Sequence, residues 1–202
     1  YWGGAMAGRF LGAMALGKGP VSPRRLATMA LVGVLAFGLI YGAVYLESGR
    51  DFPLIRVLPF LAFLALNLLG FVIGRSAPGR TLTVFALIAI GLLLTTLLSG
   101  GAVAMWTVIG IGLFNSIMWS NIFTLAIRGL GRYTSQGSSL LVMAILGGAL
   151  VPFVQGSLAD SLGGYHLSFV VPVFCYAYLA WYGWRGYPVR LFRRYRQSIE
   201  ID

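Results

Sequence analysis

Six long stretches without a charged residue constrain what this chain can fold into. They cover residues 26–46, 57–74, 81–98, 102–127, 137–159 and 165–184. A helix needs about 20 mostly apolar residues to cross the hydrocarbon core of a bilayer, so each stretch is a candidate membrane span. Backbone amides find no water in lipid, and runs of this length satisfy them as α-helices. The sequence therefore predicts an all-α membrane protein, a polytopic helical bundle in a lipid bilayer.

Composition supports a lipid environment over an aqueous one. The chain has 202 residues, of which 58% are hydrophobic and 10% are charged, whereas a soluble domain carries roughly 25% charged residues. The net charge of +10 could suggest nucleic acid as a partner, but the basic residues lie between apolar runs and form no basic patch on a soluble face. We therefore expect no nucleic-acid partner.

The distribution of basic residues predicts the orientation of the spans. If the spans alternate, thirteen of the fifteen lysines and arginines share one side of the membrane: Arg9, Lys18, Arg24, Arg25, Arg75, Arg80, Arg128, Arg132, Arg185, Arg190, Arg193, Arg194 and Arg196. Arg50 and Arg56 lie on the other side. Cytoplasmic loops are enriched in such residues, so the basic side and the C-terminus are predicted to be cytoplasmic.

The two ends of the chain need separate interpretations. Residues 1–16 form an incomplete span that begins at Tyr1 rather than Met, which indicates a fragment of a longer protein. The tail, residues 187–202, is basic with interleaved aromatic residues. Binding to nucleic acid is one interpretation of the tail, and contact with anionic lipid at the cytoplasmic surface is the favoured one.

Polar residues inside one span are the first candidates for a binding site. Asn115 and Asn121 interrupt the apolar run 102–127, with Trp119 between them. An amide in hydrocarbon needs a partner. These amides could form hydrogen bonds to a neighbouring helix and so have a purely structural role. Alternatively, amides and an indole face could line a cavity for a neutral, hydroxyl-rich ligand such as a sugar. Composition does not separate the two possibilities.

Several function classes lack their characteristic residues. No span interior contains Asp, Glu or Lys, the residues that usually couple transport to protons. The sequence has no P-loop, no HExxH motif and no Ser/His/Asp set, so neither ATP hydrolysis nor intramembrane proteolysis is supported. The chain is not expected to be an enzyme, and nothing indicates a cofactor or a metal site.

A stripe of glycines predicts close helix packing near the N-terminus. Gly4, Gly8 and Gly12 recur every four residues and so lie on one helix face. Small residues in such a stripe allow a second helix to approach closely. We interpret this stripe as a packing surface.

Four blocks of the sequence resemble a known family. They are YWGGAMAGRFLG, GLFNSIMWSNIFTLAIRGLG, TSQGSSLLVMAILGGALVPFVQGSLAD and VPVFCYAYLAWYG. In this order they are similar to the fucose–proton symporter family, a sugar-transporting branch of the major facilitator superfamily. The closest similarity is to its bacterial glucose/galactose transporters. The blocks cover residues 1–20 and roughly 81–186.

The resemblance implies the C-terminal portion of a twelve-helix carrier in the bacterial inner membrane. Residues 1–20 would be the end of helix eight with its cytoplasmic motif, and residues 80–186 would be helices nine to twelve. Residues 21–79 would be an inserted pair of helices, for which peripheral packing is expected, and residues 187–202 a cytoplasmic tail. The partners would be a small-molecule sugar, a coupling cation, usually a proton, and the N-terminal half of the transporter, which carries the coupling carboxylates.

The resemblance also implies a site. Asn115 and Asn121 would hydrogen-bond sugar hydroxyls, Trp119 would stack on the sugar's apolar face, and Tyr1 and Trp2 would contribute less. The family usually has phenylalanine, proline and threonine where this chain has Trp119, Ser120 and Asn121. A second hypothesis from another class is a non-transporting membrane protein, a sensor or an assembly subunit derived from a transporter half.

Overall fold

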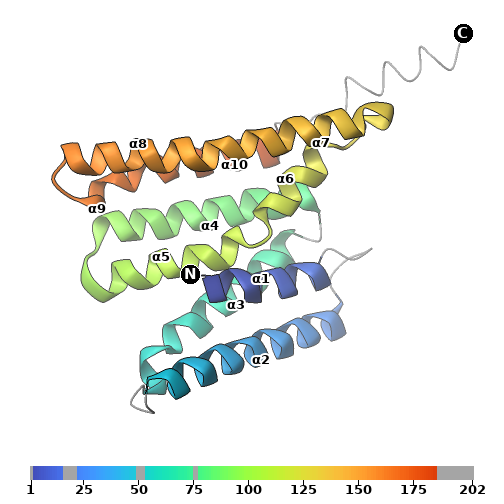
Figure 1. The fold of residues 1–202 in the computed structure, drawn as a ribbon. Coiled ribbons are helices and arrows are strands. Elements are labelled where there is room, and N and C mark those ends of the chain that lie inside the picture. Colours follow the sequence, from blue (N-terminus) through green and yellow to red (C-terminus); the bar gives the residue numbers. More distant parts are fainter. Residues whose placement is uncertain (1, 16–21, 49–52, 75–76, 186–202) are drawn as a thin grey trace, which may run out of the picture.

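A computed structural model of the protein describes residues 2–15, 22–48, 53–74 and 77–185. The described residues form helices and turns without any strand (Figure 1). The helices are α1 (Trp2–Ala15), α2 (Pro23–Glu47), α3 (Leu58–Gly74), α4 (Pro78–Leu98), α5 (Gly101–Asn115), α6 (Met118–Ala126), α7 (Thr134–Met143), α8 (Gly147–Ser161), α9 (Tyr165–Ser168) and α10 (Val170–Trp184). Short 3₁₀ segments occur at Leu54–Arg56, Gly131–Tyr133 and Ala144–Leu146.

The predicted spans are helical. Five helical stretches are long and apolar enough to cross a membrane: Pro23–Glu47, Pro78–Leu98, Gly101–Ala126, Gly131–Ser161 and Tyr165–Trp184. The sixth predicted span is α3, a shorter apolar helix of 17 residues. That length lies at the lower end of the range that spans a bilayer. The expectation of an all-α polytopic membrane protein is confirmed.

Local sequence signals account for several helix ends. The Ser22 hydroxyl accepts a hydrogen bond from the backbone N–H of Arg25 at 3.3 Å, and Pro23 follows at the first helical position of α2. Pro78 begins α4 in the same way. The turn from α4 to α5 passes through Gly101, whose φ of +59° is unfavourable for residues with a side chain.

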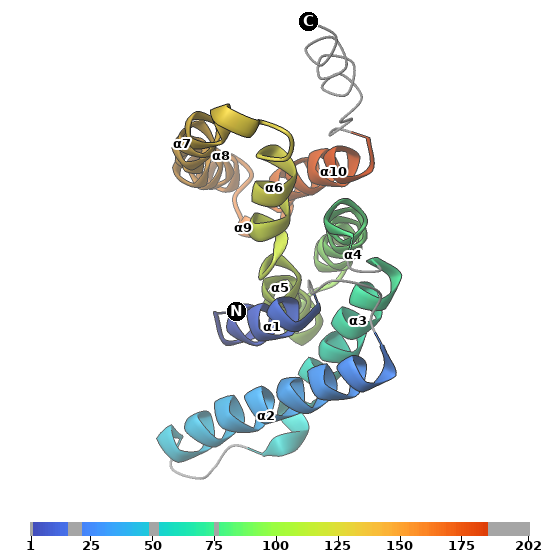
Figure 2. The same cartoon turned by 90° about the vertical axis from the view of Figure 1, so that its right-hand side faces the viewer.

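Helix α4 lies at the centre of the bundle. It packs against α3, α5, α6 and α10, and the end-on view shows it among the other helices (Figure 2). Three buried aromatic rings connect α3, α4 and α5. The Phe71 and Phe85 ring centroids are 5.0 Å apart and those of Phe85 and Phe114 are 5.4 Å apart, both edge to face. This geometry is favourable for aromatic pairs and fixes how these helices pack.

The glycine stripe of α1 packs closely against another helix, as predicted. A methyl group added at Gly8 would lie 2.6 Å from the Leu113 carbonyl oxygen and would also collide with the Ser116 hydroxyl. One added at Gly12 would collide with Ile117. The stripe therefore brings the backbone of α1 directly against the end of α5, as small residues do at close helix contacts.

The two helices of the expected insert differ in their burial. Helix α2 packs against α1 and α3 and exposes most of its surface, as expected for a peripheral helix. Helix α3 contacts α4 and α5 and buries Phe60, Leu64, Asn67 and Phe71. The expectation of peripheral packing is therefore wrong for α3, because its apolar side chains complete the core beside α4.

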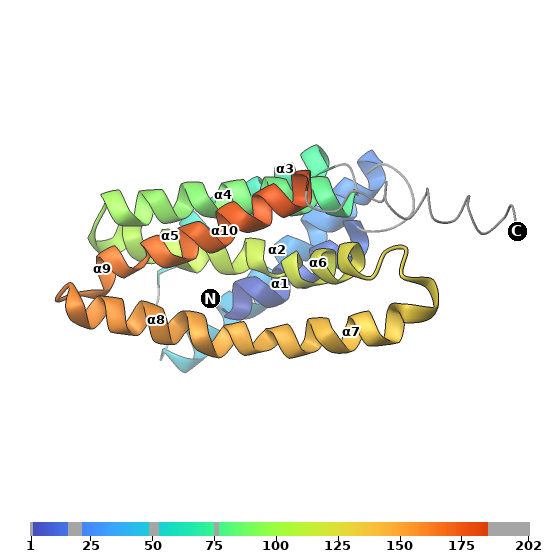
Figure 3. The same cartoon turned by 90° about the horizontal axis from the view of Figure 1, so that it is seen from above.

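Helices α7 and α8 form one long rod (Figure 3), on the opposite side of the bundle from α2 (Figures 1 and 2). Their main contacts are with α6, α9 and the short segments beside them in the chain. The most apolar window of this rod contains no buried residue. Large apolar side chains are exposed along it, namely Leu140, Met143, Leu146, Leu150 and Phe153. The described bundle thus leaves this rod largely uncovered.

Candidate functional site

The span that carries Asn115 and Asn121 is broken in its middle. Helix α5 ends at Asn115 and α6 begins at Met118, with Ser116 and Ile117 in a turn between them. Within the described residues the break contains no proline. The Leu113 carbonyl oxygen accepts hydrogen bonds from the Ser116 hydroxyl at 2.7 Å and from the Asn67 side-chain amide at 3.4 Å. Side-chain donors of this kind make irregular backbone tolerable in a membrane.

Asn115 lies at the break and is tied to a distant helix. The Tyr176 hydroxyl on α10 donates a hydrogen bond to the Asn115 side-chain oxygen at 2.7 Å. Asn115 is the fifteenth residue of the 26-residue span Gly101–Ala126 and therefore lies near the middle of that span. Tyr176 is also near the middle of the span Tyr165–Trp184. The bond is an inter-helix contact at mid-membrane depth.

The side chain of Asn121 is buried without a hydrogen-bond partner among the described residues. It is 1% exposed, and within the described chain neither its amide nitrogen nor its oxygen has a partner. Met118 and Leu125 are buried on the same side of α6. An unsatisfied buried polar group costs about 1–3 kcal/mol. Such a group in a native protein calls for an explanation, and a water molecule or a bound ligand would provide one.

Trp119 faces away from Asn121. It is 43% exposed, and its ring centroid lies 6.4 Å from that of Phe123. Asn115 ends α5 and bonds Tyr176, whereas Trp119 lies on α6 beyond the turn at Ser116 and Ile117. The structure therefore gives Asn115, Trp119 and Asn121 three different surroundings.

The remaining candidates lie at the N-terminus. Tyr1 lies outside the described residues. Trp2 begins α1, and its side chain also lies outside the described part.

Two polar residues at or beside the break were not among the candidates. Tyr176 bonds Asn115 from α10, and Asn67 supports the break from α3. Both lie in apolar runs, where a hydroxyl or an amide needs a partner. That signal was available for both residues. The partner itself was not, because it lies in a span 61 residues away for Tyr176 and 46 residues away for Asn67.

The described residues contain no group of three or more His, Cys, Asp or Glu side chains that could hold a metal ion. The chemistry available around the break is instead that of neutral donors and acceptors: the side chains of Asn67, Asn115, Ser116, Asn121 and Tyr176. Such groups can form hydrogen bonds with an uncharged polar molecule.

Comparison with known proteins finds several that are similar to part of this chain. The chain is 55% identical to the glucose/galactose transporter of Brucella abortus over 108 residues, which is 54% of this chain and 26% of that protein. This chain is a homologue of bacterial sugar transporters. It is also 38% identical over 105 residues to the L-fucose-proton symporter of Escherichia coli, covering 52% of this chain and 24% of the symporter. The symporter of the same name from Haemophilus influenzae is 36% identical over 81 residues, 38% of this chain and 19% of that protein.

The chain spans about a quarter of the length of the curated relatives it matches. No family model matches the chain, and no solved structure matches it. The names of the relatives describe transport of a solute, which agrees with the expectation that the chain is not an enzyme.

Proposed function

We propose that this chain is the C-terminal part of a secondary active sugar transporter of the major facilitator superfamily. Its sugar would be a hexose such as glucose or galactose, or fucose, carried across the bacterial inner membrane by alternating access. The 55% identity to a glucose/galactose transporter is the observation that carries this proposal. A broken helix with a polar break at mid-membrane depth supports it, because carriers commonly place their sites at such discontinuities.

Asn115, Asn121 and Trp119 are the proposed sugar contacts, with Tyr1 and Trp2 as secondary ones. Tyr176 would hold the Asn115 oxygen and so orient its amide group, since the two side chains are bonded at 2.7 Å. The missing partner of Asn121 would be supplied by a ligand hydroxyl or an ordered water. Trp119, exposed on α6, would offer its ring to the apolar face of a sugar that enters from the uncovered side.

Coupling would involve a second half of the transporter, encoded upstream. The spans of this chain contain no Asp, Glu or Lys in their interiors, and a proton needs such a group inside the membrane. Two relatives are named fucose–proton symporters, which favours a proton as the coupling cation. The N-terminal half would cover the exposed rod of α7 and α8 and contribute the carboxylates.

The test starts from the upstream coding sequence and uses the complete protein in membrane vesicles. Counterflow of labelled glucose, galactose and fucose is expected for at least one sugar. Asn115→Leu and Asn121→Leu are each expected to reduce that exchange at least tenfold. Gln136→Leu makes the same chemical change at an exposed position near the start of α7 and is expected to leave exchange unchanged.

Two results would contradict the proposal. Full exchange in both asparagine variants would reject the assigned site. An upstream sequence without a membrane half that carries acidic span residues, together with no exchange of any of the three sugars, would reject transport itself.

A further inference from the structure

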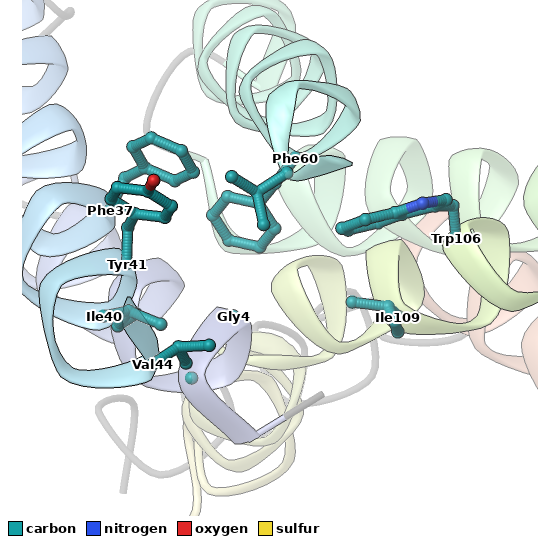
Figure 4. Close-up of a pocket in the computed structure, with 10 residues that line it drawn as sticks. Gly4, Phe37, Ile40, Tyr41, Val44, Phe60, Trp106 and Ile109 are labelled. Atoms are coloured by element: carbon teal, nitrogen blue, oxygen red, sulfur yellow. The ribbon is translucent and has the colours of Figure 1, made fainter. Parts of the chain in front are cut away.

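A partly open cavity lies between α1, α2, α3 and α5, and Asn115, Trp119 and Asn121 are not among the residues that line it (Figure 4). Its volume is about 220 Å³. Phe37 and Tyr41 reach it from α2, Phe60 from α3 and Trp106 from α5, as the close-up shows. The Phe37 and Phe60 rings stack at 5.9 Å with 14° between their planes. Carbon atoms thus form nearly all of its wall.

Glycines keep this cavity open on the side of α1. A methyl group added at Gly4 would lie 3.2 Å from the Phe60 ring, and one added at Gly3 would lie 3.3 Å from Ile40. Side chains at these two positions would push into the space between α1 and its neighbours. The cavity therefore results from the same lack of side chains on α1 that allows its close packing.

The depth of the cavity corresponds to the acyl region of one leaflet. Trp106 is five residues from the Gly101 end of α5, and Tyr41 is six residues from the Glu47 end of α2. At about 1.5 Å per residue, both lie about 8 Å below the ends of their spans. These two ends share the side opposite to the basic loops if the spans alternate. The cavity is then in the leaflet opposite to the cytoplasm.

The wall of the cavity continues into the surface of α2 that faces lipid. Ile40 lines the cavity and is itself 36% exposed on α2. Hydrocarbon that covers Ile40 can extend into the cavity without crossing a polar barrier. Water gains little there, because it needs two to four polar partners.

We propose that this cavity binds one acyl chain of a phospholipid from that leaflet. The chain would supply the van der Waals contacts that the empty space lacks, between flat aromatic walls that suit methylene groups. It would also join α2 to the bundle, since α2 packs mainly on α1 and contacts α3 less. The lipid would be a structural component of the protein and not its transported substrate.

A photoactivatable phospholipid tests this binding site. The complete protein is reconstituted in phosphatidylethanolamine–phosphatidylglycerol vesicles that contain a phospholipid with a diazirine in the upper third of one acyl chain. After illumination, mass spectrometry locates the adducts. We expect them to concentrate on cavity residues from three helices, namely Ile40, Val44, Phe60 and Ile109.

A matched pair of variants separates the cavity from the general lipid surface. Val44→Trp fills the cavity and should reduce adducts on Phe60 and Ile109 at least fivefold. Leu46→Trp adds the same bulk two residues along α2, at a position 69% exposed, and should leave them unchanged. If Val44→Trp does not fold, the adduct map of the unmodified protein still decides the question.

Three results would overturn the proposal. Adducts could be confined to exposed residues of α2, with none on Phe60 or Ile109. Labelling of cavity residues could fall when excess sugar is added, which would make the cavity a sugar site. Lipid labelling of the cavity residues could also be absent. If a cysteine at position 44 then forms a disulfide with a cysteine on a helix from the rest of the protein, that helix is the occupant of the cavity. None of these measurements depends on sugar transport, so the lipid site and the transport function fail separately.

Discussion

At the scale of single residues, we expect the buried side chain of Asn121 to lower the stability of the fold and to be required for sugar exchange. Its amide is fully enclosed and has no partner among the described residues. Replacing it with leucine removes an unsatisfied polar group, which costs about 1–3 kcal/mol when buried. We expect Asn121→Leu to raise the unfolding temperature of the detergent-purified protein while sugar exchange is lost. A lower unfolding temperature would mean that the amide stabilises the fold through a partner.

Gly8 and Gly91 allow a second comparison at this scale. Alanine at Gly8 would place a methyl group 2.6 Å from the Leu113 carbonyl oxygen, whereas nothing lies within 4 Å of the corresponding position at Gly91. Overpacking of this kind costs about 1–3 kcal/mol, and alanine gains roughly 1 kcal/mol of helix propensity over glycine. We therefore expect Gly8→Ala to lower the unfolding temperature and Gly91→Ala to maintain or raise it. Equal effects would show that α1 does not pack tightly on α5.

The roles of individual residues could be predicted only in part, because their interaction partners are far away in the sequence. Asn115 and Asn121 are identifiable because an amide is rare in an apolar run. Whether each amide forms a structural hydrogen bond between helices or lines a binding site depends on the groups that surround it in the fold. For Asn115 the structure supplies Tyr176, while for Asn121 it supplies no partner within the described chain. The sequence therefore predicts that each amide needs a hydrogen-bond partner, but it does not predict which group that partner is.

At the scale of helices, the break between α5 and α6 could not be predicted from the sequence. The run 102–127 reads as one span, because it has no charge and no proline. Its interruption at Ser116 and Ile117 depends on contacts from other helices. Gly8 and Gly12 of α1 approach it closely, and Asn67 of α3 donates to the Leu113 carbonyl. Tertiary packing thus overrides local helix propensity here.

The two donors on the Leu113 carbonyl predict an energetic coupling. Asn67→Leu removes the donor from α3, and Ser116→Ala removes the local one. Each hydrogen bond inside a membrane protein is worth about 0.6 kcal/mol on average. We expect Ser116→Ala alone to lower unfolding stability by roughly that amount, because Asn67 still serves the carbonyl. Asn67→Leu alone loses its bond but also removes a buried side-chain oxygen that has no partner among the described residues, so its effect should be smaller or stabilising. The double variant should lose more than the sum, because the carbonyl then has no side-chain donor.

The double-variant cycle uses Thr95→Val as its control. That hydroxyl donates to the Gly91 carbonyl one turn earlier and is exposed on α4. Its combination with Asn67→Leu should be additive within about 0.5 kcal/mol, as distant sites are. Additivity between Asn67→Leu and Ser116→Ala would show that α3 does not support the break.

At the scale of the whole molecule, the described bundle has two exposed flanks. On one side α2 presents leucines and Val34, together with Gly38 and Gly42, which have no neighbour within 4 Å. On the other, the rod of α7 and α8 carries exposed apolar residues with glycines at Gly147, Gly148 and Gly156 that have no neighbour within 4 Å. Small residues on an uncovered helix face favour another helix over lipid. The spans and their order were predictable from hydropathy, but which flank meets lipid was not.

The orientation of the whole molecule depends on whether the 17-residue helix α3 crosses the membrane. An inserted pair of spans preserves the orientation of everything after it, whereas a single one reverses it, and the separation of basic residues agrees with a pair. We expect Ser48→Cys and Ser161→Cys, in a Cys175→Ser background, to react in intact cells with a membrane-impermeant maleimide. Ala77→Cys and Ser135→Cys should react only after permeabilisation. None of these changes removes a charge, so the topogenic arginines stay in place. Reaction of Ser48→Cys and Ala77→Cys from the same side would show that α3 re-enters instead of crossing, and would place α4 and all later helices in the reverse orientation.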